Sequence, residues 1–146
     1  MRSRPCVRPA TSWGQPRVTE PLVVDASAMV DVLVGSPIAD EVVEALRNSE
    51  LHVPAHFDAE ILSALGHLQR SGRLSPRQVA TRLRRVADAP IQRQPLSPLL
   101  AGAWSRRSDL RLVDALYVEL ASQMGTRVAS TDRGLSRASS IVELIG

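Results

Sequence analysis

A short apolar run that ends in an aspartate constrains the fold of this chain more than any other feature. The run 22–24 follows a proline and leads directly into Asp25, after which a helix-like pattern begins at Ala26. A wholly apolar run of this length is typical of a strand buried on both faces, as in a parallel sheet. Asp25 would then lie at the carboxyl end of the strand, which is the edge of an open α/β sheet where ligands bind. We therefore interpret Asp25 as a residue with a chemical role.

Beyond this run, apolar segments and amphipathic segments alternate along the chain. Their alternation predicts an α/β domain with a parallel sheet. The glutamines in 91–96 place that strand near an edge of the sheet. Strands are expected over 21–24, 51–54, 91–96, 127–130 and 141–145, and helices over 26–34, 38–48, 56–71, from Pro76 onward, 98–107, 112–124 and 132–139.

Size and composition fit one ordinary domain. The 146 residues are 44% hydrophobic but only 3% aromatic, so the core must consist of Leu, Val, Ile and Ala. No apolar run approaches the roughly 18 residues of a membrane span. The single cysteine, Cys6, has no internal partner for a disulfide, which favours a cytoplasmic protein.

The amino-terminal region differs from the rest. Residues 1–20 are rich in proline and arginine and lack periodicity, so we expect a disordered tail before a domain over 21–146. Four of the 18 basic residues lie within 1–17, which leaves 14 basic residues against 15 acidic ones elsewhere. The nearly neutral domain lacks the overall positive charge of a strongly basic nucleic-acid-binding protein.

Four acids share one kind of position. Asp25 ends the first strand, Glu60 lies early in the helix after the second, Asp114 opens the helix 112–124, and Asp132 follows the strand that ends at Ser130. The fold could bring them to one edge of the sheet, where they would repel one another unless a cation neutralised them. All-oxygen ligands suit Mg²⁺ or Mn²⁺ rather than zinc. A divalent ion with an open face can hydrolyse a phosphodiester.

A structural role is the alternative for each acid. The helix dipole stabilises an acid in a first turn, and that alone can account for Asp114 and Asp132. Glu60 has apolar neighbours on both sides and is less easily explained in this way. Asp25 is the hardest of the four to assign to structure.

Four segments together resemble the PIN-domain family, and in particular the VapC ribonuclease toxins. The resemblance covers residues 21 to about 145 and implies a three-layer α/β/α domain with about five mostly parallel strands. It implies that Asp25, Glu60, Asp114 and Asp132 bind Mg²⁺ or Mn²⁺. It also implies that Ser27 supports the first acid and that Ser130 precedes the last acid in the site. The matching segments are 24–27, 53–61, 113–118 and 130–135.

The same resemblance implies a Mg²⁺-dependent endoribonuclease that is the toxin of a type II toxin–antitoxin pair. Its partners would be an RNA substrate, a second copy in a homodimer, and a VapB-type antitoxin docked on the helical hairpin that follows Glu60. This chain departs from the family pattern at two positions. Val113 stands where an aromatic residue is common, and Thr131 beside Ser130 leaves open which hydroxyl faces the site.

Other functions stay open or are excluded. A PIN scaffold that binds nucleic acid or a partner protein without catalysis is the alternative, although four intact acids argue against it. Receiver domains and haloacid-dehalogenase-like phosphatases rely on a lysine, and this chain has none.

Several further residues have both functional and structural readings. The arginines of the helical hairpin either hold RNA phosphates or form a solvated face. The three histidines are expected in core or supporting roles, because a metal nuclease needs no histidine base. Two aromatic residues are expected to pack in the core. These residues are Arg70, Arg73, Arg82, Arg84 and Arg85, His52, His56 and His67, and Trp104 and Tyr117.

Overall fold

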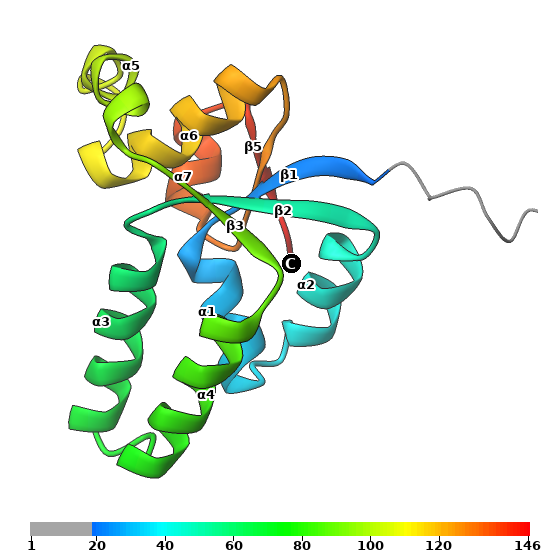
Figure 1. Ribbon diagram of the computed structural model, residues 1–146, viewed down its shortest axis with the longest axis vertical. Helices are drawn as coiled ribbons and strands as arrows, with labels where there is room; N and C mark the ends of the chain where they lie inside the picture. Colours follow the sequence, from blue (N-terminus) through cyan, green and yellow to red (C-terminus); the bar gives the residue numbers. More distant parts are fainter. Residues whose placement is uncertain (1–18) are drawn as a thin grey trace, which may run out of the picture.

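The computed structural model describes residues 19–146 and shows one sheet between two layers of helices (Figure 1). The α/β class is confirmed. Residues 1–18 of the expected tail lie outside the described residues, and the first strand already begins at Glu20. The elements are β1 (Glu20–Val24), α1 (Ala26–Val34), α2 (Ala39–Leu46), β2 (Ser49–Pro54), α3 (Phe57–Arg70), α4 (Pro76–Asp88), β3 (Ile91–Gln94), the 3₁₀ helix η2 (Ser97–Leu99), α5 (Leu100–Ser105), α6 (Leu112–Met124), β4 (Val128–Ser130), α7 (Arg133–Ala138) and β5 (Val142–Leu144).

The sheet has five strands in the order β3-β2-β1-β4-β5, and every pair is parallel. The predicted strand β1 lies at its centre, with Val23 and Val24 fully buried. The strand order reverses between β1 and β4, and a reversal of this kind opens a crevice at the carboxyl ends of the strands. The predicted edge strand, β3, is confirmed at the edge.

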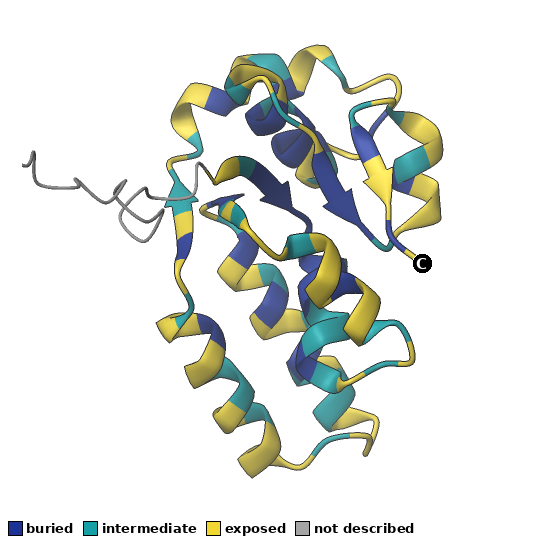
Figure 2. Cartoon of the chain, turned by 90° about the vertical axis from the view of Figure 1, so that its right-hand side faces the viewer, coloured by how far each residue is buried: buried dark blue, intermediate teal, exposed yellow. Residues whose placement is uncertain are grey.

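Helices cover both faces of the sheet. Helix α6 packs against β1, β2 and β4 on one face, whereas α1 contacts β4 on the other face and packs against α2 and α3. Figure 2 shows the buried strands between these two layers. Helices α3 and α4 form a hairpin that extends away from the sheet (Figure 1). The core is aliphatic apart from Phe57 and Tyr117, the two largest fully buried side chains.

Capping residues account for the start of α4 and the end of α6. Ser75 caps α4 by accepting a hydrogen bond from the backbone N–H of Gln78 (3.1 Å), and the Gln78 side chain accepts one from the Ser75 N–H (2.8 Å). Gly125 ends α6 with a φ of 67°, a left-handed conformation that suits glycine.

The segment around 95–105 differs from the expectation. β3 ends at Gln94 because Pro95 has no N–H to continue the strand ladder. The single helix expected over 98–107 is divided into η2, which contains Pro98, and the shorter α5. Within residues 19–146, no helix combines the length and the apolar character needed to cross a bilayer.

Candidate active site

Asp25 is held by two hydroxyl groups at the carboxyl end of β1. Its side chain is 6% exposed and makes no capping hydrogen bond, although Asp25 occupies the N-cap position of α1. Ser27 Oγ and Ser130 Oγ both donate to Asp25 Oδ2, at 2.7 and 2.8 Å. Ser130 is fully buried on β4, so this contact crosses the reversal in strand order. Thr131 instead donates to Asp31 (2.7 Å), which identifies Ser130 as the hydroxyl at the site.

The environment of Asp25 opposes its negative charge. Burial raises the pKa of the carboxyl group, and the hydrogen bonds from Ser27 and Ser130 only partly counter this effect. The charge of Glu60 raises the pKa further, so the net pKa lies above the ordinary value of 3.8. A buried carboxylate beside other acids is a feature of functional sites rather than of ordinary helix caps.

Glu60 lies in the first turn of α3 and is half-buried. The Tyr117 hydroxyl donates to Glu60 Oε1 at 2.7 Å, and His56 Nε2 lies 3.1 Å from the same oxygen. Burial raises the pKa of Glu60, but the hydrogen bonds from His56 and Tyr117 and the charge of Arg111 outweigh it, and the net pKa is lowered. The pKa of Glu60 is therefore shifted in the opposite direction to that of Asp25.

Asp114 and Asp132 complete the group from α6 and from the start of α7. Burial raises the pKa of Asp114, the Arg111 guanidinium lowers it, and the charges of Asp25, Glu60 and Asp132 raise it, with a net upward shift. Arg111 Nε lies 3.3 Å from Asp114 Oδ2, and the arginine side chain is 78% exposed. Asp132 is exposed and caps α7, because its Oδ1 accepts a hydrogen bond from the N–H of Leu135 (3.1 Å).

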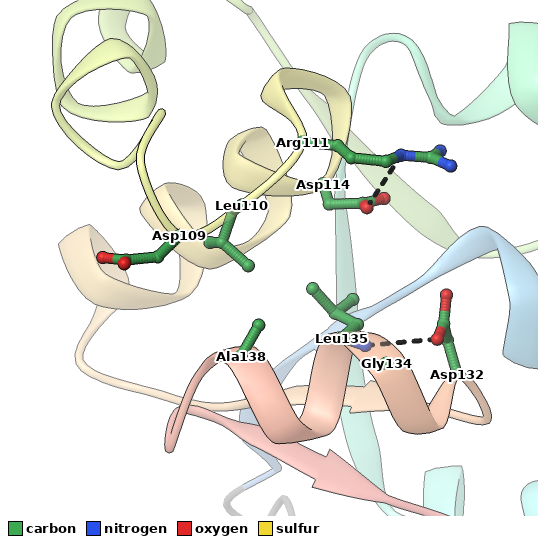
Figure 3. Close-up of a pocket in the computed structure, with 8 residues that line it drawn as sticks. All are labelled: Asp109, Leu110, Arg111, Asp114, Asp132, Gly134, Leu135 and Ala138. Atoms are coloured by element: carbon green, nitrogen blue, oxygen red, sulfur yellow. Dashed lines mark hydrogen bonds and ion pairs between the residues drawn. The ribbon is translucent and has the colours of Figure 1, made fainter.

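The four predicted acids thus lie at one edge of the sheet and act on one another electrostatically. Asp114, Asp132 and Arg111 line a pocket of about 200 Å³. Figure 3 shows Asp114 and Asp132 on two sides of it, with Arg111 beside Asp114. Within the described part of the chain, no three Asp, Glu, His or Cys side chains lie close enough together to hold a metal ion. Glu60, Asp114 and Asp132 each contact a neighbouring protein group instead.

Tyr117, His56 and Arg111 contact the acids of the site, and none of these contacts was predicted from the sequence. Tyr117 has the buried ring that was expected, but its hydroxyl serves Glu60. His56 lies four residues before Glu60. Arg111 lies three residues before Asp114, and Tyr117 lies three residues after it. Positions three or four apart share a helix face, so this spacing is the sequence signal that could have revealed them.

The other histidines divide between the core and the surface. His52 is buried, with Nε2 2.6 Å from Glu50 and Nδ1 3.0 Å from the Gln94 side chain, which confirms a core role. His67 is exposed, so the prediction of a core or supporting role is wrong for this residue. It lies in the last turn of α3.

The hairpin arginines do not line the acidic site. Arg82 donates to the carbonyl of Leu33 at 2.8 Å and so fastens α4 to α1. Arg70 lies ten residues after Glu60, which places it about 15 Å further along α3 at 1.5 Å per residue. Arg111 is instead the arginine beside the acids.

An apolar surface adjoins the site. Trp104 is 58% exposed, so the prediction that it packs in the core is wrong. Its ring carries the Arg107 guanidinium 4.8 Å from the ring centroid. Leu112 and Val113, which separate Arg111 from Asp114, are also exposed. Together with Leu100, Ala103 and Leu116 they line a hollow of about 220 Å³.

The chain is similar to known proteins both in sequence and in fold. A family model described as PIN domain matches residues 22–141. The chain is 51% identical over 128 residues to ribonuclease VapC3 of Mycobacterium tuberculosis, which covers 87% of this chain and 93% of that protein. Its fold is similar to that of M. tuberculosis VapC20, described as a sarcin-ricin loop cleaving toxin (TM-score 0.62, 17% identity, 81% of this chain and 95% of that chain). It is also similar to a chain of a toxin–antitoxin complex from Klebsiella pneumoniae (TM-score 0.62, 15% identity, 84% and 95%).

Proposed function

Because this chain belongs to the PIN-domain family and resembles its VapC ribonucleases throughout, we propose that it is a Mg²⁺-dependent endoribonuclease and the toxin of a toxin–antitoxin pair. The observation that best supports this function is the setting of Asp25. A buried carboxylate that two serines hold, and that Glu60 and Asp114 act on electrostatically, has little structural use. An RNA-cleaving metal site requires such an arrangement.

The donor set fits a hard divalent cation. Asp25, Glu60, Asp114 and Asp132 would hold Mg²⁺, with Mn²⁺ as a substitute, because both ions prefer carboxylate oxygens. Burial, and to a smaller extent repulsion by neighbouring acids, raise the pKa values of Asp25 and Asp114, and a bound cation would offset both effects. When bound, it would polarise the phosphodiester and lower the pKa of the attacking water.

The test is RNA cleavage by the purified full chain in Mg²⁺ or Mn²⁺, with and without a chelator. We expect cleavage that stops when EDTA is added and returns when excess Mn²⁺ is restored. Metal removal should act on catalysis and leave the protein folded, which circular dichroism checks. Absence of cleavage in either metal, with RNA still bound, would favour the alternative of an inactive scaffold.

Arg111 is suited to contact an RNA phosphate. Arg111 lines the pocket, and its exposed guanidinium lies beside Asp114. We propose that Arg111 neutralises one phosphate and so reduces the repulsion between the acidic site and an anionic substrate.

Arg111→Ala should weaken RNA binding by about tenfold and reduce the salt dependence of binding by about one phosphate contact. The measurement is the apparent dissociation constant for a short RNA at several salt concentrations. Arg47→Ala is the matched control, since Arg47 is exposed directly after α2 and forms an ion pair with nearby Glu44. If RNA binding by wild type and by Arg111→Ala depended equally on salt concentration, Arg111 would not contact an RNA phosphate.

We also propose the partners that a VapC toxin requires. One is a cognate VapB-type antitoxin on the α3–α4 hairpin, supported by the likeness to a chain of a toxin–antitoxin complex. Another is a second copy in a homodimer, which light scattering would detect as twice the 15.9 kDa chain mass. We propose that the protein acts in the cytoplasm, in keeping with its proposed RNA target.

A further inference from the structure

We propose that Tyr117 and His56 are positioning residues that hold the Glu60 carboxylate beside Asp25 and Asp114. The inference rests on the proposed nuclease function and goes beyond it, because neither residue is one of the expected metal ligands. It concerns how the protein places one of its four acids. Each of the two side chains reaches Glu60 from a different element.

Both side chains contact the same carboxylate oxygen. Tyr117 Oη on α6 donates to Glu60 Oε1 at 2.7 Å, and His56 Nε2, just before α3, lies 3.1 Å from that oxygen. The two rings also pack together, with centroids 4.9 Å apart. Glu60 is therefore approached from across the domain and from its own helix. One hydrogen bond and one close polar contact on the same oxygen fix the orientation of the carboxylate more firmly than either would alone.

His56 also connects the helices that present two of the acids. Its Nε2 lies 3.0 Å from the carbonyl oxygen of Val113, the residue before Asp114. Nε2 thus faces two acceptors, the Val113 carbonyl and Glu60 Oε1, which suits an N–H at this nitrogen. The first turn of α3, which presents Glu60, is thereby joined to the start of α6, which presents Asp114.

Packing alone does not account for these groups. The Tyr117 ring is fully buried, and a phenylalanine would fill that space without placing a hydroxyl in the core. The hydroxyl that tyrosine adds is used, because it donates to Glu60 Oε1 at 2.7 Å. His56 Nδ1 is buried and makes no hydrogen bond with the described residues, a cost that a purely structural position would not require.

Without these donors Glu60 would be repelled from the site. Its side chain is 30% exposed, and its charge acts unfavourably on both Asp25 and Asp114. A free glutamate in this position would turn towards solvent. Groups that orient a metal ligand in this way typically alter metal affinity or activity by about 10- to 100-fold.

The test compares Tyr117→Phe with the wild type by Mn²⁺ titration calorimetry. We expect the Mn²⁺ dissociation constant to rise about tenfold, the Mn²⁺ concentration for half-maximal RNA cleavage to rise in parallel, and the KM for RNA to stay unchanged. His56→Ala should act in the same direction. His56→Gln, which keeps a side-chain N–H donor, should recover part of the affinity.

Two controls separate positioning from a general loss of packing. Phe57→Leu disturbs a buried aromatic residue next to His56 without touching Glu60, so it should lower the melting temperature but keep the Mn²⁺ affinity. In a Glu60→Gln background, Tyr117→Phe should cause little further loss of Mn²⁺ affinity. If Tyr117→Phe bound Mn²⁺ as tightly as the wild type, the positioning role would be refuted while the proposed function would stand. A wild type that neither binds Mn²⁺ nor cleaves RNA would instead overturn the proposed function on which the inference depends.

Discussion

Replacing Asp25 by asparagine should lower the rate of RNA cleavage by about 1000-fold or more, equivalent to about 4 kcal/mol of transition-state stabilisation. The substitution preserves the size of the side chain and removes only its charge. Asp25 is the most buried of the four acids and the one that two serines orient. No neighbouring carboxylate can take its place, because each of the others is held by its own partner.

The same substitution should not unfold the protein. Burial makes the charge of Asp25 unfavourable in the metal-free protein, so the melting temperature of Asp25→Asn should equal or exceed that of the wild type at pH 7. Cleavage of a labelled RNA and growth of cells that express each variant are the measurements. Asp88→Asn is the matched control, since Asp88 is exposed at the end of α4. Full activity or full toxicity in Asp25→Asn would refute a role for this carboxylate in catalysis.

The fold was predictable wherever one local pattern dominated. The apolar run before Asp25 can only be buried on both faces, and it forms the central strand β1. Glycine after α6 and the Ser75 cap before α4 fixed those helix boundaries to within one or two residues. Near Pro95 and Pro98 several weak signals compete, and there the predicted boundaries were wrong.

The candidate site was predictable in its acids but not in what surrounds them. Parallel strands end at one edge, so topology alone brings Asp25 and Asp132 to the same place. The contact between Tyr117 and Glu60 depends on how α6 lies over the sheet, which sequence periodicity does not specify. The exposure of Trp104 is a similar case, because an aromatic residue in a short amphipathic helix usually points inwards.

Mg²⁺ or Mn²⁺ should raise the melting temperature strongly at pH 7 and only weakly near pH 4. A ligand at about 100 times its dissociation constant stabilises the folded state by about 2.7 kcal/mol, or about 8 °C for a domain of this size. The pKa values of Asp25 and Asp114 are raised in the folded protein, so their ionisation costs stability as the pH rises through those folded-state pKa values. A cation offsets that cost, and the offset is lost when the carboxyl groups are protonated.

Glu60 opposes this trend in the metal-free protein. Its pKa is lowered, so it adds stability above the unfolded value of 4.5, and that stability is lost as the pH falls through its folded-state pKa. Differential scanning calorimetry from pH 4 to 8 without Mn²⁺ measures the pH dependence that these carboxylates cause by themselves, and the same scans with Mn²⁺ measure how far the cation changes it. Asp25→Asn should remove most of the Mn²⁺ effect at pH 7, while Asp88→Asn should retain it. A Mn²⁺ effect of equal size at both ends of the pH range would contradict binding by these carboxylates.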